Sequence, residues 1–131
     1  MRDKRRDEML IQFNSDYEKI SMGFLSYIED FKDPSRLQEE IERYKTSEER
    51  DLLLWQSEET GNLIGLIGIE KENDYILLRH ISIDPSFRNE GISYRMLEAL
   101  RERYPNNNII STLETASIVS NWQKRRIEEQ K

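Results

Sequence analysis

Two segments before residue 50 place apolar residues at helical spacing. After a short candidate strand at 10–13, Ser15 and Glu18 have the spacing of a capping box that starts a helix. One side of this helix is predicted to carry Tyr17, Ile20, Phe24, Tyr27 and Ile28. The second segment has Asp33 as N-cap and Pro34 at the first helical position, and its single apolar stripe consists of Leu37, Ile41 and Tyr44. The pattern predicts two helices, the second a surface helix.

From residue 51 the pattern changes to short apolar runs at 52–55, 63–69 and 75–83, separated by polar turns at 59–62 and 71–74. Short turns between such runs predict an antiparallel meander. In the third run the residues of both parities are apolar, so we expect this strand to be central and covered on both faces.

Pro85 ends the third run, and a long helix follows with Ile92, Met96, Leu97, Leu100 and Tyr104 on one face. A fourth strand is predicted at 109–113 and a last helix at 116–123, which carries Ile118, Val119 and Trp122. The expected organisation is a disordered charged extension at 1–8, one domain at 9–124 and a charged tail at 125–131.

Composition narrows the classes of function. The chain has 131 residues, with 20 Lys and Arg against 26 Asp and Glu, for a net charge of −6. This balance argues against binding to nucleic acid or to an anionic membrane. No apolar run is long enough to cross a bilayer, so a soluble, cytoplasmic protein is expected. With no Cys and one His, the chain offers no thiolate or multi-histidine metal site, and no metal is expected.

The most informative junction is a strand, a proline turn, a glycine-containing loop and a helix at 81–93, ISIDPSFRNEGIS. The first N–H groups of a helix lack partners within it and attract anions. Gly91 and Ser93 allow close approach to the backbone, and Arg88 adds positive charge. Together these features favour binding of a diphosphate.

This junction resembles the cofactor signature of the GNAT superfamily of acyl-CoA-dependent N-acetyltransferases, and the resemblance covers about residues 9–124. It implies a mixed α/β (α+β) fold, with a mostly antiparallel central sheet flanked by helices and without the two closing strands frequent in the family. The segments LLLWQ, LIGLIGIEK and RHISIDPSFRNEGI are similar to the RibT-type proteins of riboflavin-biosynthesis operons. The implied activity is acetyl transfer from acetyl-CoA to a small-molecule or peptidic amine, in association with riboflavin metabolism.

The resemblance also implies which residues hold the cofactor. The main-chain amides of Arg88, Asn89, Glu90, Gly91, Ile92 and Ser93 would bind the pyrophosphate. The backbone of Ile81, Ser82 and Ile83 would pair with the pantetheine arm where this strand separates from the strand at 109–113. Thr115 and Trp122 match two further cofactor positions. The family often has Asn at the position of Thr115 and Tyr at that of Trp122, and an indole N–H is too weak an acid to protonate the departing thiolate.

Acetyl transfer to an amine needs a base for the ammonium proton. His80 alone titrates naturally near neutrality, and it is either this base or a core-side histidine bonded within the fold. Glu70 and Glu114 each end an apolar strand, where they act through water or are simply solvated. Arg79 either binds an acidic acceptor or pairs with Glu70 or Asp84.

Two alternatives remain open at this stage. The first is a catalytically silent GNAT-fold module that binds CoA or a protein partner, and the second is a small α/β scaffold without a nucleotide. An exposed sheet edge at 109–113 would favour a homodimer.

Overall fold

The computed structural model describes residues 8–57, 59–88 and 90–130. Its strands are β1 (Glu8–Gln12), β2 (Arg50–Ser57), β3 (Leu63–Lys71), β4 (Tyr75–Ile83) and β5 (Asn108–Ser111). Its helices are α1 (Glu18–Leu25), α2 (Pro34–Thr46), α3 (Ile92–Arg103) and α4 (Ala116–Glu129), with short 3₁₀ turns at Ser15–Tyr17, Glu29–Lys32 and Pro85–Phe87. Apart from Glu8, which begins β1, the predicted disordered extension lies outside the described residues.

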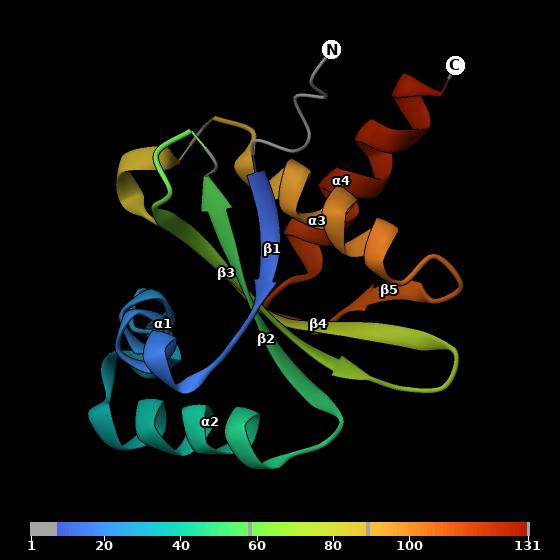
Figure 1. The fold of residues 1–131 in the computed structure, drawn as a ribbon. Helices are drawn as coiled ribbons and strands as arrows, with labels where there is room; N and C mark the ends of the chain where they lie inside the picture. Colours follow the sequence, from blue (N-terminus) through green and yellow to red (C-terminus); the bar gives the residue numbers. More distant parts are fainter. Residues whose placement is uncertain (1–7, 58, 89, 131) are drawn as a thin grey trace.

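The strands form one sheet in the order β1-β2-β3-β4-β5 (Figure 1). Neighbouring strands from β1 to β4 are antiparallel, and β5 runs parallel to β4. The predicted meander of β2, β3 and β4 is therefore confirmed, as is the mixed, mostly antiparallel sheet. The parallel pair arises because α3 carries the chain back across the sheet between β4 and β5.

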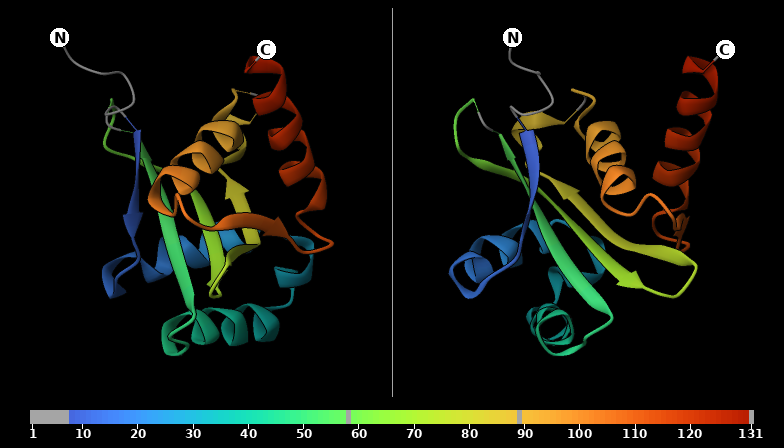
Figure 2. Two further views of the ribbon diagram at one scale, coloured as in Figure 1. Left: turned by 90° about the vertical axis from the view of Figure 1, so that its right-hand side faces the viewer. Right: turned by 45° about the vertical axis from the view of Figure 1, so that its right-hand side comes forward.

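Helices cover both faces of the sheet, with α1 and α2 on one side and α3 and α4 on the other (Figure 2). Each side has its own apolar cluster. The α1/α2 cluster includes Phe24, Leu25, Phe31, Ile41, Leu52, Leu54 and Leu66, and the α3/α4 cluster includes Leu53, Ile67, Ile76, Leu78, Met96, Leu97 and Trp122. This arrangement explains why both parities of β4 are apolar.

The two N-terminal helices begin in different ways. Asp33 accepts from Ser35 N at 2.9 Å, as the N-cap prediction requires. The predicted capping box at Ser15 is wrong, because Asn14 caps a 3₁₀ turn by accepting from Asp16 N at 2.8 Å, and α1 begins only at Glu18. Ile20, which the helical spacing predicts to pack, is 40% exposed.

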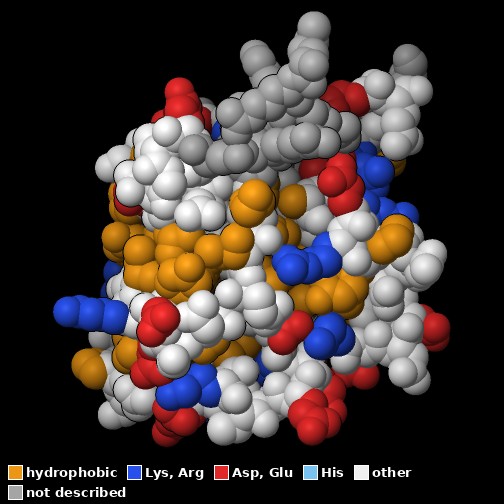
Figure 3. Space-filling model, in the orientation of Figure 1, with side chains coloured by type: hydrophobic (Ala, Val, Ile, Leu, Met, Phe, Trp, Pro, Cys, Tyr) orange, Lys and Arg blue, Asp and Glu red, His pale blue; other side chains and the backbone are white. Residues whose placement is uncertain are grey.

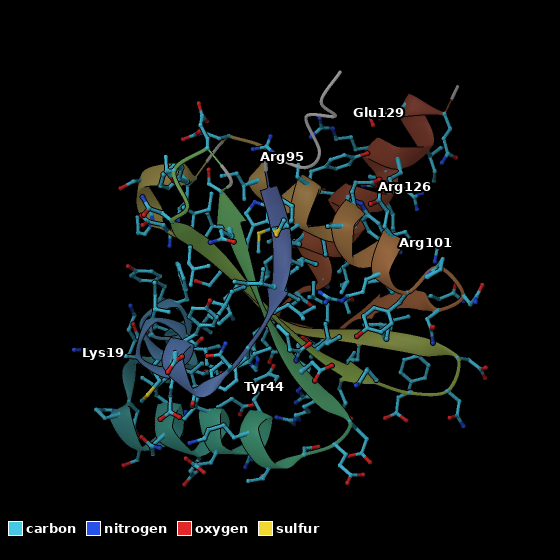
Figure 4. The ribbon with its side chains drawn as sticks, viewed as in Figure 1. Lys19, Tyr44, Arg95, Arg101, Arg126 and Glu129 are labelled. Atoms are coloured by element: carbon cyan, nitrogen blue, oxygen red, sulfur yellow. The ribbon has the colours of Figure 1, made fainter. Side chains whose placement is uncertain are left out.

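Helix α4 continues through most of the segment predicted as a charged tail. Its last turns are held by charged contacts, with Arg126 Nε 3.0 Å from Glu98 Oε1 of α3 and Tyr94 of α3 donating to Glu129 Oε2 at 2.7 Å. Figure 4 shows Arg126 and Glu129 on the part of α4 that lies beside α3. Charged residues at the end of this chain therefore pack two helices together.

The outer face of α2 is charged, with acidic and basic side chains along the lower edge of the molecule (Figure 3). Within the described residues, no helix is both long and apolar enough to span a membrane. The same residues include no cluster of three or more His, Asp and Glu side chains that could ligate a metal.

Candidate functional site

A β-bulge in β4 determines which side chains reach the site. His80 pairs with Gly68 of β3, and the next pair joins Leu78 to Ile69, so Arg79 is an extra residue in β4. Ile76 and Leu78 pack in the α3/α4 cluster before the bulge, and Ile81 and Ile83 pack there after it. Arg79 and His80, which would point to opposite faces of a regular strand, consequently line the same cavity.

β4 and β5 separate beyond the bulge. Their pairing covers only Tyr75–Leu78 with Asn108–Ser111, and Figure 2 shows the two strands diverging toward α4. Thr115, which precedes the first residue of α4, connects the two strands where they separate. Its buried hydroxyl donates to Leu78 O at 2.8 Å and accepts from Thr112 N at 3.0 Å. The predicted separation of these strands is therefore present, and the edge of β4 at 81–83 has no β5 partner.

Two adjoining cavities follow this free edge. The first, the Arg88 cavity, has a volume of about 310 Å³, and its walls are Tyr27, Ile28, Ile81, Ser82, Ile83, Arg88, Ser93 and Ile118. The second, the His80 cavity, has a volume of about 430 Å³. Ile28, Ile81 and Ile118 line both cavities, so the two adjoin along β4 between the start of α3 and the bulge, and together they are called the groove.

The loop before α3 is where the sequence predicts an anion site. Gly91 is the N-cap of α3 with φ 75°, and it has no side chain to accept from the first-turn amides. The Ile92 side chain is in the core, so at this position only the backbone can face a ligand, and Glu90 is exposed. Arg88 lies over the Tyr27 ring at 5.9 Å. Asn89 lies outside the described residues.

The His80 cavity combines apolar walls with charged groups. Its apolar walls come from Ile28, Phe31, Ile81 and Ile118. Its polar residues are Asp30, Arg36, Glu39, Glu40, Arg43, Arg79, His80, Thr112, Glu114 and Thr115. The predicted residues Arg79, His80, Glu114 and Thr115 are thus brought together in one cavity, whereas Glu70 does not line it.

His80 is fixed by its neighbours. Its Nδ1 lies 2.6 Å from the Tyr44 hydroxyl, and the Phe31 ring meets the imidazole edge to face at 5.1 Å. Gly68 makes the approach of Tyr44 possible, because a Cβ there would overlap the hydroxyl and lie 2.6 Å from Cζ. The sequence pattern predicts Tyr44 only as a residue of an apolar stripe. The polar end of a tyrosine on such a stripe, opposite a glycine in a buried strand, is the signal that could have found this contact.

Burial lowers the pKa of His80 from its usual 6.5 to about 4, while Glu40 raises that pKa and Arg79 and Arg50 lower it to smaller extents. At pH values between these two pKa values, the unfolded chain binds a proton at His80 that the folded chain does not bind. The free energy of unfolding therefore falls as the pH drops from about 6.5 to about 4.

We expect His80→Gln to remove this part of the acid sensitivity. Denaturant titrations between the two pH values should show the stability advantage of the wild type over the variant shrinking by on the order of 2 kcal/mol as the pH falls. A constant difference would contradict the buried, neutral state of His80.

A chain of ion pairs links charged residues of the cavity to β2 and β3. Glu40 binds Arg50 at 2.6 Å and Arg43 at 3.2 Å, and Glu70 contacts Arg50 at 3.4 Å and Arg79 at 3.3 Å. Glu70, a predicted base, thus lies outside the cavity and is engaged by two arginines. Arg79 keeps a buried Nε that has no hydrogen-bond partner among the described residues.

Glu114 is an exposed carboxylate of the cavity, as are Asp30 and Glu39. Hydrogen bonds from its own backbone N–H and from the Thr112 side chain lower its pKa below the usual 4.5. The group is therefore ionised at neutral pH and is accessible to water.

Trp122 occupies a different place from its prediction. The side chain is 5% exposed in the α3/α4 cluster, and its Nε1 donates to Glu98 Oε1 at 2.8 Å. It lines neither cavity. The helical spacing that put Trp122 on the inner face of α4 is correct, but this face packs on α3 and not on the groove.

Comparison with known proteins agrees with the geometry. Residues 15–126 match the family described as "Acetyltransferase (GNAT) family". A curated relative from Bacillus methanolicus, "Uncharacterized N-acetyltransferase in lysA 3'region", is 42% identical over 112 residues, which cover 85% of this chain and 92% of the relative.

Solved structures share the fold. The aminoglycoside N-acetyltransferase AAC(6')-Iy in complex with CoA is 16% identical, with a TM-score of 0.68 over 90% of this chain and 85% of that one. The spermidine N-acetyltransferase from Vibrio cholerae in complex with CoA and spermine is 14% identical, with a TM-score of 0.67 over 91% of this chain and 79% of that one. At these identities the likeness concerns the fold alone.

Proposed function

Because the chain belongs to the acetyltransferase (GNAT) family and is an N-acetyltransferase, we propose that it transfers the acetyl group of acetyl-CoA to a small-molecule or peptidic amine. The observation that carries this proposal is the groove along the free edge of β4, which joins the amides before α3 to a cavity with titratable side chains. Two proteins with this fold are bound to CoA in solved structures, which supports acetyl-CoA as the acetyl donor here.

In this proposal acetyl-CoA lies along the groove. Its pyrophosphate binds the first amides of α3 around Gly91, with Arg88 beside it, because a helix start favours negative charge. The amides of pantetheine pair with the free backbone groups of 81–83, so that the cofactor takes the place of a sheet strand. The acetyl end then reaches the His80 cavity.

The acceptor amine binds in the His80 cavity and attacks the thioester carbon. A C–N bond forms, the C–S bond breaks, and the departing thiolate takes a proton from solvent, since Trp122 lies outside the groove. Glu114 receives the ammonium proton through water, because it is an ionised, exposed carboxylate of the cavity and lies close enough to His80 to act on its charge. Arg79 contributes a donor to an acidic group on the acceptor, consistent with its unpartnered Nε.

Thiol release from acetyl-CoA tests the proposed function. With a panel of amines that includes polyamines, peptides and amines of flavin metabolism, we expect thiol release with at least one acceptor. Glu114→Gln should slow this release by about 100-fold, the size of a typical general-base contribution. Binding of acetyl-CoA without release for any amine would instead favour the catalytically silent module.

Two finer parts of the proposal concern metabolism and oligomeric state. The link to riboflavin metabolism rests on the resemblance of short segments to RibT-type proteins. A homodimer is supported by the outer edge of β5 and the residues that follow it, where Ile110 is 39% and Leu113 94% exposed beside the cavity residues Thr112 and Glu114. Analytical ultracentrifugation of the wild type and of Leu113→Glu tests the dimer.

A further inference from the structure

The contact between Tyr44 and His80 determines which ring nitrogen of His80 carries the proton. Tyr44 is buried between α2 and the sheet (Figure 4), and its hydroxyl lies 2.6 Å from His80 Nδ1. Among the described residues, His80 is the only hydrogen-bond partner of this hydroxyl. A buried O–H without an acceptor is unfavourable, so the phenol donates and Nδ1 accepts.

A neutral imidazole has one N–H and one lone pair. When Nδ1 accepts from Tyr44, the proton must be on Nε2, and Nε2 can then donate but cannot accept. A carboxylate at Nδ1 would impose the opposite tautomer, because a carboxylate only accepts. Glu40, the carboxylate of α2 that acts on His80, is instead held by Arg50 and Arg43. The phenol therefore reverses the arrangement that makes a histidine a base.

We propose that Tyr44 holds His80 as the Nε2–H tautomer, so that His80 donates a hydrogen bond to the acetyl carbonyl oxygen and does not accept the amine proton. This inference rests on the proposed function, in which acetyl-CoA lies along 81–83 and ends beside His80. Negative charge develops on that oxygen as the amine attacks, and a fixed donor stabilises it. Tyr44 is then a positioning residue.

The surroundings of His80 agree with a neutral donor. The charged groups that act on it are Glu40 of α2, Arg79 of β4, Arg50 of β2 and Glu114 before α4. The contacts of the ring with Phe31 and with Tyr44, whose ring centroid is 5.7 Å away, restrict its rotation. The Nε2–H direction is thus set before any ligand binds.

Nitrogen NMR of the wild-type protein with ¹⁵N-labelled histidine tests the tautomer directly, because the chain has a single histidine. At pH 7 we expect the shift pattern of a neutral ring protonated at Nε2. In Tyr44→Phe the pattern should move toward a mixture of tautomers, whereas Tyr17→Phe, a partly buried tyrosine outside both cavities, should leave it unchanged. A ring protonated at Nδ1, or a charged ring, would overturn the proposal. This measurement needs no acetyl-CoA, so its failure is distinct from failure of the proposed function.

Two substitutions of His80 test the donor role. His80→Ala should lower kcat by about 100-fold, as loss of one such donor does. His80→Gln keeps an N–H donor and should remain within about 10-fold of the wild type, a smaller loss than that of a missing donor. The wild-type pH profile of kcat should show no inflection near the usual pKa of histidine. Equal losses in the two variants, with acetyl-CoA binding retained, would overturn the donor role.

Discussion

Gly91→Asp should weaken acetyl-CoA binding by at least about 100-fold, which corresponds to about 2.7 kcal/mol. The new carboxylate would stand at the N-cap of α3, where we propose that the pyrophosphate binds. Two like charges about 4 Å apart near a protein surface repel by about 4 kcal/mol. An aspartate would also cap the first amides of α3 itself and so compete with the phosphates. Isothermal titration calorimetry measures the loss of affinity for acetyl-CoA.

Gly61→Asp is the matched control. Gly61 has the same φ of 75° in the turn between β2 and β3, has open space around it, and lines neither cavity. Both variants therefore gain the same charge and the same left-handed strain. We expect Gly61→Asp to bind acetyl-CoA like the wild type. If Gly91→Asp also retains its affinity, the pyrophosphate does not bind at this loop.

Gly68→Ala should destabilise the fold by about 3 kcal/mol, the sum of overpacking and a lost buried hydrogen bond. The added Cβ would overlap the Tyr44 hydroxyl and lie 3.1 Å from Cε1. Because Tyr44 is a rigid ring packed against His80, it must move away and release His80 Nδ1. Denaturant unfolding measures the stability, and the ¹⁵N shifts of the single histidine report the loss of its contact with Tyr44.

Gly23→Ala provides the comparison for this prediction. Gly23 is inside α1, and a Cβ there would meet nothing within 4 Å. Alanine in a helix is more favourable than glycine by about 1 kcal/mol, so this variant should be more stable than the wild type. Equal stabilities of Gly68→Ala and Gly23→Ala would contradict the close approach of Tyr44 to β3.

Much of the architecture follows from local patterns. The change of period at residue 51 predicts the meander, and the proline and glycine around 85–91 predict the start of α3. These signals work because each element buries one face at its own spacing. The loop before α3 could be identified for the same reason, since its chemistry is that of backbone groups in consecutive residues.

The arrangement around His80 could not be read from the sequence. The extra residue at Arg79 depends on the pairing of β4 with β3, and it moves Arg79 to the side of His80. The partner of His80 comes from a helix far away in the chain, because Gly68 leaves room for Tyr44. Choices among hydrogen-bond partners, such as Asn14 in place of Ser15, are likewise made by the packed structure.

A crystal structure of the protein with acetyl-CoA would test the proposed groove most directly. We expect the pyrophosphate within hydrogen-bond distance of the amides at the start of α3, the pantetheine paired with 81–83, and the acetyl carbonyl oxygen facing His80 Nε2. An unoccupied groove at saturating acetyl-CoA, or a nucleotide bound elsewhere on the molecule, would contradict this account.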